Sequence, residues 1–192
     1  MEQVRCFVAI ELPEEVKAGL TRLQAKLKYA TSVPVKWVDP TGIHLTLQFL
    51  GDIDRDVTGL ITEAITRGAT GIESFPLEVK GLGVFPNSSR LRVLWVGLTG
   101  GLYSLQRLQK AIETNLQGLG FTPDARDFTP HLTLARVRDS ATPQERQSLG
   151  ELINNPKFEL DFCFKVTVVK LMRSQLTQTG AIYSTISSIQ LL

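Results

Sequence analysis

The sequence is poor in cysteine and histidine. Its 192 residues include two cysteines and two histidines. Cys6 and Cys163 both lie in apolar stretches typical of strands, so we expect buried free thiols rather than a disulfide or a nucleophile. A catalytic zinc ion needs about three protein ligands, and no carboxylate stands at a spacing that would join the two histidines in such a site. We therefore expect no metal ion and no other cofactor.

Long hydrophobic runs and a strong net charge are also missing. No apolar run approaches the roughly 20 residues that a membrane-spanning helix needs, and residues 1–12 carry acids without the hydrophobic region of a signal peptide. The net charge of +2 is too small for a protein that wraps nucleic acid, although it permits a local positive pocket. Hydrophobic residues make up 43% of the chain and charged residues 21%, as in ordinary globular domains. We expect a cytoplasmic monomer with no membrane partner.

What the sequence does contain is one tetrapeptide, His-Leu-Thr-Leu, at residues 44–47 and again at residues 131–134. These two copies hold the only histidines of the chain. Apolar and polar residues alternate within each copy, which is the pattern of a half-buried strand. We therefore expect the leucines of each copy to face a core, and the histidine and threonine to point together to the other side.

The order of the predicted elements also repeats. Helical spacing of apolar residues predicts helices at residues 13–29, 54–69, 102–116 and 143–153. Strands are predicted at residues 4–10, 34–38, 43–50, 75–84, 90–98, from residue 131 onward, and at 158–171 and 182–192. After Gly100-Gly101 the order helix, histidine strand, helix, strand, strand begins again, and the two histidines are 87 positions apart (131 minus 44). An internal duplication into halves 1–99 and 100–192 explains this order most simply.

The chain is long enough for one domain with a substantial core. Duplicated halves usually pack about an approximate twofold axis, which would place the two histidine-threonine faces across one central cleft. We therefore predict an α+β fold in a single bilobal domain, residues 1–192. Two pseudo-symmetric lobes would have mainly antiparallel sheets lining the cleft, with helices on the outside.

Two histidines across a cleft suit the hydrolysis of a phosphodiester. An imidazole with a pKa near 6.5 acts at neutral pH as a base or, when protonated, as an acid. One of His44 and His131 would take a proton from water while the other gives one to the departing ribose oxygen. The hydroxyls of Thr46 and Thr133 would donate hydrogen bonds to the non-bridging phosphate oxygens. The residues alone do not decide which histidine is the donor.

Other interpretations stay open at this point. The histidines are ordinary surface or core residues if the two strands serve only to build sheets. A noncatalytic module that binds RNA ends or nucleotides would use the same cleft. A serine or cysteine nucleophile has no local support, because the chain has no nucleophile-elbow sequence and neither cysteine lies in a basic loop.

Longer stretches around the two tetrapeptides resemble the HxTx motifs of the 2H phosphoesterase superfamily. The matching segments are HLTLQFLG at residues 44–51 and FTPHLTLARVR at residues 128–138. The resemblance is closest to the RNA 2′,3′-cyclic phosphodiesterases, also called 2′-5′ RNA ligases. It extends over nearly the whole chain, through VRCFVAIELPEE, VKWVDPTG, GLGVFPNSSRLRVLWVGL and LMRSQLTQTGAIYSTI.

This resemblance implies a hydrolase that opens a terminal RNA 2′,3′-cyclic phosphate, without a metal ion, to leave a 2′-phosphomonoester. It also implies that His44 is the proton donor and His131 the proton acceptor. The partners would be RNA ends or nucleotides that carry a 2′,3′-cyclic phosphate. The alternatives within the same cleft are 2′-5′ RNA ligation and hydrolysis of a cyclic nucleotide.

Four further residues are predicted to bind substrate. Phe49 and Arg136 each follow their histidine by five positions, and the resemblance associates such an aromatic and such an arginine with the terminal nucleotide. The pleat alone predicts the opposite, because an odd offset places both on the leucine face unless a bulge or a strand end intervenes. Gln48 shares the predicted face of His44 and is expected to line the cleft. Tyr183 either lines it too or is a core tyrosine with its hydroxyl at the rim.

Overall fold

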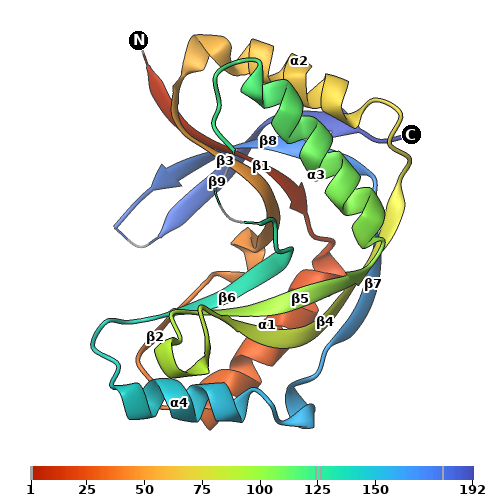
Figure 1. The fold of residues 1–192 in the computed structure, drawn as a ribbon. Coiled ribbons are helices and arrows are strands. Elements are labelled where there is room, and N and C mark those ends of the chain that lie inside the picture. Colours follow the sequence, from red (N-terminus) through yellow and green to blue (C-terminus); the bar gives the residue numbers. More distant parts are fainter. Residues whose placement is uncertain (1, 124, 126, 179) are drawn as a thin grey trace.

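The computed structural model describes residues 2–123, 125, 127–178 and 180–192. Its α-helices are α1 (Glu14–Ala30), α2 (Thr58–Ala69), α3 (Leu102–Gln117) and α4 (Pro143–Leu152) (Figure 1). Its strands are β1 (Gln3–Glu11), β2 (Val35–Trp37), β3 (His44–Asp54), β4 (Phe75–Phe85), β5 (Val93–Gly100), β6 (His131–Val137), β7 (Asp161–Val166), β8 (Val168–Leu176) and β9 (Ala181–Gln190). No helix in the described ranges is both long and apolar enough to cross a membrane.

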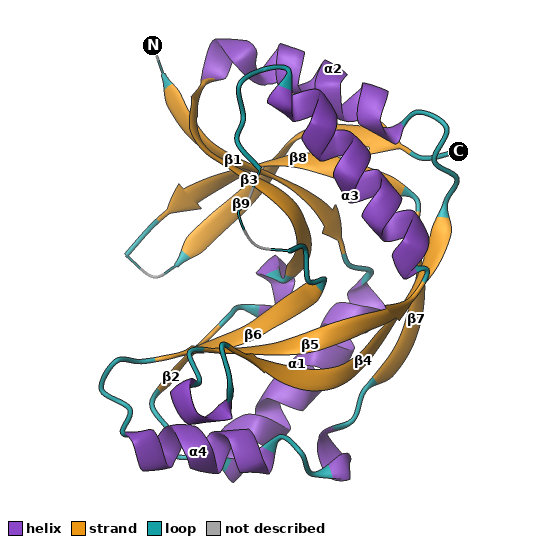
Figure 2. Cartoon of the chain, viewed as in Figure 1, coloured by secondary structure: helices purple, strands orange, loops and turns teal. Residues whose placement is uncertain are grey.

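The strands form two sheets, and the two histidines lie in different ones. Sheet A has the strand order β3-β1-β8-β9, and sheet B has the order β2-β6-β5-β4-β7. Every strand pairing in the described ranges is antiparallel. In Figure 2, α2 and α3 lie above sheet A while α1 and α4 lie below sheet B, so the helix-free faces of the sheets turn toward each other. The predicted α+β class, with antiparallel sheets between outer helices, is confirmed.

One hydrophobic core holds α1, α2 and α3 against the outer faces of both sheets. The buried Leu149 of α4 belongs to a separate, smaller cluster. The apolar stripe of α1 is buried as its spacing predicts, with Leu20 and Leu27 fully inaccessible. From the same helix, Gln24 donates a hydrogen bond of 3.0 Å to the Leu134 carbonyl in β6. On the other side, Thr62 of α2 shares a hydrogen bond of 2.9 Å with Ser187 of β9. The helices therefore cover the sheet faces that point away from the histidines.

Each sheet combines strands from both halves of the sequence. Sheet A takes β1 and β3 from the first half and β8 and β9 from the second, and sheet B mixes the two halves in the same way. A lobe of the structure is therefore not the same unit as residues 1–99 or 100–192. The predicted single strand at 158–171 is wrong for this reason, because the chain leaves sheet B after Val166 and enters sheet A at Val168. No glycine or proline marks this change of sheet in the sequence.

Two smaller expectations are also corrected. Strand β3 continues past Gly51, where it was expected to end, because Gly51 adopts a φ of 74° at a register shift opposite Cys6 and the strand then resumes. Cys6 is buried as predicted, and burial raises the pKa of its thiol to about 11. Cys163 is exposed instead, because it pairs with Glu78 on the helix-free face of sheet B, in the edge strand β7.

Candidate active site

A short turn before β3 fixes the side chain of His44. Asp39 caps the 3-10 turn at Pro40–Gly42, and its carboxylate accepts hydrogen bonds from the Thr41 hydroxyl at 2.8 Å and from the Thr41 backbone N–H at 2.9 Å. These bonds hold the pKa of Asp39 below its ordinary value. The turn ends at Gly42, whose carbonyl oxygen lies 2.8 Å from Nδ1 of His44.

The second histidine is held in the same way. Nδ1 of His131 lies 2.7 Å from the carbonyl oxygen of Thr129, again two residues earlier in the chain. A carbonyl oxygen only accepts hydrogen bonds, so Nδ1 is the donor in both histidines. This arrangement leaves Nε2 of each imidazole as the nitrogen that can exchange a proton with a substrate.

The predicted division of the two tetrapeptides is confirmed for the leucines. Their side chains are buried in the core, with exposed fractions of 1% and 4% in the first copy and 0% for both in the second. Across the strands, Thr46 pairs with Ala9 of β1 and Thr133 pairs with Trp95 of β5. Residues that pair across strands share a face, so each threonine lies on the helix-free face of its sheet, together with its histidine.

A β-bulge follows the threonine in both strands. In β3, Thr46 pairs with Ala9 whereas Gln48 pairs with Val8, so Leu47 is the extra residue. In β6, Thr133 pairs with Trp95 whereas Ala135 pairs with Leu94, so Leu134 is the extra residue. The bulge moves the pleat by one residue and reverses which face the following side chains occupy.

The bulge places Phe49 and Arg136 on the histidine faces, despite their odd offset. Phe49 pairs with Phe7, and the two ring centroids are 6.2 Å apart. Arg136 pairs with Val93 on the face that also carries His131. The bulge therefore places both side chains on the histidine face, opposite to the face that the pleat alone predicts.

Gln48 is turned the other way, and the expectation that it shares the His44 face is wrong. Its partner Val8 belongs to the core face of sheet A, and only 7% of Gln48 is exposed. Neither polar atom of its side chain has a hydrogen-bond partner among the described residues. The bulge at Leu47 is the physical reason, since without it Gln48 would lie four residues from His44 on the same face.

Aromatic rings enclose His44. Phe7 stacks on the imidazole at a centroid distance of 4.6 Å and an angle of 28°, and Tyr183 meets it edge-on at 5.0 Å. Tyr183 in turn lies over Gly42, where an added Cβ would come within 3.2 Å of its ring. Tyr183 thus packs directly against His44 on the helix-free side of sheet A.

The electrostatic surroundings of His44 have opposing effects. Burial lowers the pKa of the imidazole, whereas the hydrogen bond to Gly42 and the charge of Glu11 raise it, and the lowering is larger. Glu11 is the cross-strand partner of His44. Lys170 of β8 forms an ion pair with Glu11, so the carboxylate that acts on His44 also has a cationic partner.

His131 has aromatic neighbours but no carboxylate opposite it. Phe85 meets its ring edge-on at 5.0 Å, and Trp95 lies 6.2 Å away. Trp95 packs against Gly83, where an added Cβ would come within 2.2 Å of the indole. The cross-strand partner of His131 is Gly97.

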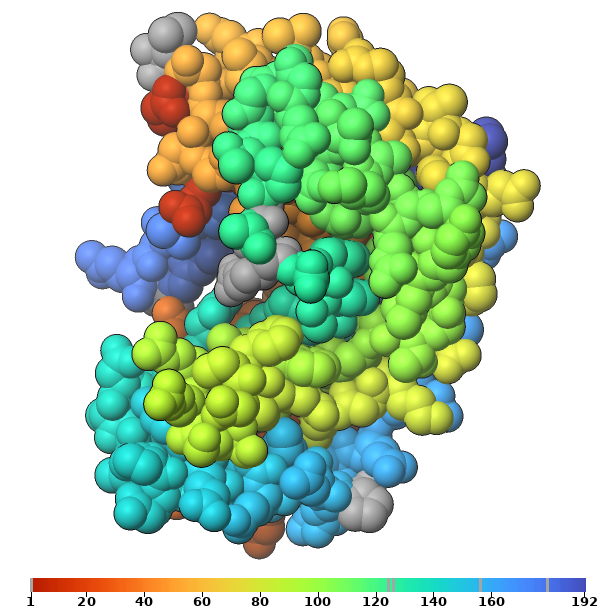
Figure 3. All heavy atoms as spheres, viewed as in Figure 1, coloured from red at the N-terminus to blue at the C-terminus, as the bar shows by residue number. Residues whose placement is uncertain are grey.

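The two histidine strands meet between the lobes. Strands β3 and β6 contact each other across the sheets. In the space-filling view the surface is indented between the upper and lower parts of the molecule, where residues of the connection from α3 to β6 lie (Figure 3). The residues that surround the histidines and that the sequence did not indicate are Phe7, Glu11, Phe85, Trp95 and Gly97. Only strand register brings them there, and no local pattern encodes that register.

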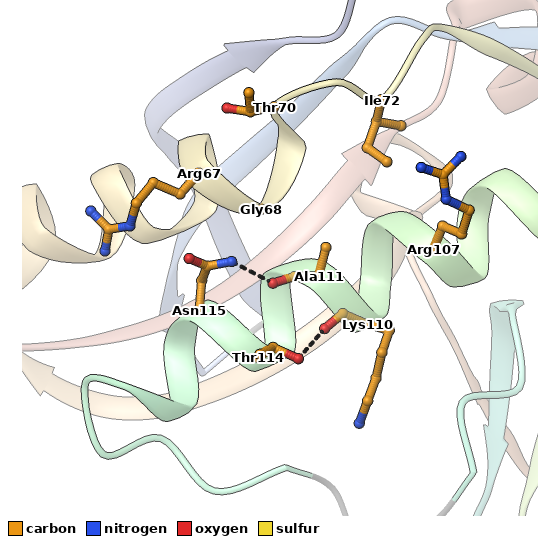
Figure 4. A pocket seen from close by; sticks show the side chains of 9 residues that line it. All are labelled: Arg67, Gly68, Thr70, Ile72, Arg107, Lys110, Ala111, Thr114 and Asn115. Carbon is orange, nitrogen blue, oxygen red and sulfur yellow. Dashed lines mark hydrogen bonds between the residues drawn. The ribbon is translucent and has the colours of Figure 1, made fainter.

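A separate hollow of about 530 Å³ lies outside this region, between α2 and α3. Figure 4 shows that Asn115 and Thr114 direct their polar groups back to their own helix, where they bond the carbonyls of Ala111 and Lys110. None of the predicted site residues lines the hollow. Among the described residues, no group of three or more histidine, cysteine, aspartate or glutamate side chains is placed to hold a metal ion.

Comparisons with known proteins agree with the fold and its repeat. The family model described as LigT like Phosphoesterase matches residues 10–95 and again residues 101–183. A relative from Methanothermobacter thermautotrophicus, named RNA 2′,3′-cyclic phosphodiesterase, is 35% identical over 182 residues, which cover 95% of this chain and 96% of the relative. A relative of the same name from Aeropyrum pernix is 33% identical and covers 89% of this chain and 94% of its own length.

Solved structures show the same architecture. A crystal structure from Thermus thermophilus superimposes with a TM-score of 0.79 at 27% identity, and the match covers 97% of each chain. The family model matches most of the chain in two consecutive parts, each of which contains one His-Leu-Thr-Leu strand. The chain therefore belongs to the LigT-like phosphoesterase family of the 2H phosphoesterase superfamily.

Proposed function

We propose that this protein hydrolyses the terminal 2′,3′-cyclic phosphate of RNA to a 2′-phosphomonoester, without a metal ion. Two lines of support combine: relatives of 33–35% identity carry the name RNA 2′,3′-cyclic phosphodiesterase, and the chain has two equivalent histidine-threonine pairs. The observation that carries the proposal is the shared hydrogen bond from Nδ1 to a backbone carbonyl, at 2.8 Å for His44 and 2.7 Å for His131. It fixes both rings with Nε2 available for proton transfer.

The proposed reaction is a single displacement at phosphorus. His131 takes a proton from water through Nε2, and the water oxygen forms a bond to phosphorus. The bond between phosphorus and the ribose O3′ breaks, and protonated His44 gives its proton to that oxygen. The products are a 2′-phosphomonoester and a free 3′-hydroxyl, so one water molecule is consumed and the proton taken by one histidine is balanced by the proton given by the other.

The threonines and the more distant residues have supporting roles in this proposal. Hydroxyl groups of Thr46 and Thr133 donate hydrogen bonds to the non-bridging oxygens, where negative charge increases in the transition state. Phe49, of which 68% is exposed, offers a ring on which the terminal base stacks. Arg136 offers a cation beside the terminal nucleotide, and Tyr183 positions the imidazole of His44 through their edge-on contact.

The surroundings of His44 affect the role of proton donor that the proposal gives it. Burial lowers the pKa of this imidazole. A more acidic imidazolium transfers its proton more readily to a poor leaving group, although less of it is protonated at neutral pH. Glu11 opposes part of this lowering and so keeps a larger fraction of His44 in the protonated form.

The decisive experiment supplies a short RNA that ends in a 2′,3′-cyclic phosphate, in excess EDTA, and identifies the product end. We expect a 2′-phosphomonoester at full rate in EDTA. The double variant His44→Ala/His131→Ala should form no product, while Lys26→Gln, a substitution at an exposed position of α1, should leave the rate unchanged. Full activity of the double variant would reject the proposal.

Parallel reactions separate the alternatives. Labelled tRNA halves reveal 2′-5′ joining, and a 2′,3′-cyclic mononucleotide reveals action on small substrates. A noncatalytic RNA-end-binding module predicts that the native protein binds labelled RNA ends without forming product, and that binding survives in the histidine variants.

A further inference from the structure

Two cations stand side by side on the histidine face of sheet B. Lys36 of β2 is the cross-strand partner of Arg136 of β6, and Arg136 also pairs with Val93 of β5. Cross-strand partners share a face, so Lys36 belongs to the same surface as His131 and Thr133. Both cationic side chains are exposed.

Like charges directly opposite each other destabilise a sheet unless an anion lies between them. Among the described residues, neither Lys36 nor Arg136 forms an ion pair with a carboxylate, and sheet A shows the contrast. Its cations on β1 and β8 each have an acidic partner: Arg5 with Asp52, Lys170 with Glu11, and Arg173 with Glu2. The uncompensated pair on sheet B therefore has the charge pattern of a surface that receives an anion from outside the chain.

The position of the pair relative to the histidine site suits the neighbouring group of an RNA strand. Thr133 pairs with Trp95 and Arg136 with Val93, so Arg136 lies two positions of β5 further along, which is roughly 7 Å at about 3.3 Å per residue. Strand β2 lies about 4.8 Å further across the sheet. If the cyclic phosphate lies at His131 and Thr133, the next anion of an RNA chain is the phosphodiester that joins the terminal nucleotide to the one before it. Long lysine and arginine side chains can reach such a group from this distance.

We propose that Lys36, together with Arg136, binds the phosphodiester that precedes the terminal nucleotide, so that the site prefers an RNA strand over a cyclic mononucleotide. The inference rests on the proposed hydrolysis of RNA 2′,3′-cyclic phosphate ends, and it adds a residue and a substrate class to it. A cyclic mononucleotide has no such phosphodiester, and Lys36 makes no contact with it.

The test compares Lys36→Gln with Lys26→Gln, a substitution of another exposed lysine that lies on α1, on the outer side of sheet B. For an RNA oligonucleotide that ends in a 2′,3′-cyclic phosphate, Lys36→Gln should lower kcat/KM about two- to tenfold at low salt. The slope of log kcat/KM against log salt concentration should fall by about 0.7, the value for one phosphate contact on a single strand. For the cyclic mononucleotide, kcat/KM should not change, and the Lys26→Gln variant should match the native protein on both substrates.

An equal loss on the two substrates, or an unchanged salt slope, would overturn the role of Lys36. Failure of the proposed function gives a different result, since the native protein would then not hydrolyse the RNA substrate. The role of Lys36 is still tested in that case, by fluorescence anisotropy with labelled RNA that ends in a 2′-phosphate. Weaker binding by Lys36→Gln than by Lys26→Gln supports it, and equal binding rejects it.

Discussion

The two histidine sites share one backbone plan but differ in the residue that stands opposite the imidazole. Glu11 pairs with His44, whereas Gly97 pairs with His131. Both strands have the same bulge and the same hydrogen bond from Nδ1, so the difference arises from the neighbouring strand. A duplicated scaffold can thus hold two identical side chains in the same geometry and still give them different surroundings.

The aromatic packing around the two histidines also differs. His44 lies under a stacked ring at 4.6 Å and an edge-on ring at 5.0 Å, and burial lowers its pKa. His131 has an edge-on ring at 5.0 Å and a second ring at 6.2 Å. The two imidazoles therefore have different aromatic surroundings.

Removing either imidazole should have the largest effect. Replacing His44 or His131 by alanine should each lower kcat/KM on the cyclic RNA end by about 10² to 10⁴. The two variants should separate on a phosphodiester whose leaving group is 4-nitrophenolate, because a good leaving group needs no proton donor. The loss of kcat/KM in His44→Ala should be much smaller on that substrate than on RNA. In His131→Ala the loss of kcat/KM should be equal on both substrates. The reverse pattern would exchange the two roles.

Removing a threonine hydroxyl should have the next largest effect on activity. Thr46→Val and Thr133→Val keep the shape of the side chain but remove a donor, and each should lower kcat about 10²-fold with little change in KM. The matched control is Thr21→Val, since that hydroxyl bonds the Lys17 carbonyl of its own helix. A pronounced rise in KM at constant kcat would instead mean that the threonines bind substrate and transition state equally.

The packing under Trp95 offers a test on the His131 side alone. Gly83→Ala places a methyl group within 2.2 Å of the indole, which must leave its position near His131. Overpacking of this kind should lower the free energy of unfolding by about 1–3 kcal/mol, measured by urea unfolding. Gly59→Ala in α2, where nothing lies within 4 Å of the new methyl group, should be neutral or stabilising. Equal stability of the two variants would contradict the packing of Trp95 on Gly83.

The smallest effect is expected at Glu11. This carboxylate raises the pKa of His44, so Glu11→Gln should lower that pKa further. A donor must be protonated to act, and a lower pKa means that protonation is lost at lower pH. The falling alkaline limb of the pH profile of kcat/KM should therefore move to lower pH, with the acidic limb unchanged. Glu14→Gln on α1 is the control, and a profile that moves equally for both substitutions would argue against a specific effect of Glu11.

Much of the fold is predictable from local sequence because the signals are local. The helices α1 and α3 have apolar stripes at helical spacing, and the leucines of both tetrapeptides are buried on the expected side. The change of sheet at Thr167 was not predictable, since the residues around it continue to favour strand and contain no turn signal.

The candidate site is even less predictable from local sequence. The alternation of His44, Thr46 and the leucines follows from the pleat, but a bulge depends on pairing with β1 and leaves no mark in residues 44–51. Gln48 and Phe49 therefore lie on faces opposite to those that the pleat alone predicts. Glu11 and Lys36 became visible only through strand register, because they lie 33 and 100 positions from the site residues opposite them (44 minus 11 and 136 minus 36).

The exchange of strands between the two sequence halves affects how the protein unfolds. Neither sheet can unfold without disturbing the other, because the strands of each sheet come from both halves of the chain. Chemical denaturation should accordingly be a single cooperative event rather than two successive ones, and a fragment that ends at Gly100 would lack β8 and β9, which complete the sheet that carries His44. Both imidazoles thus gain and lose their working positions together.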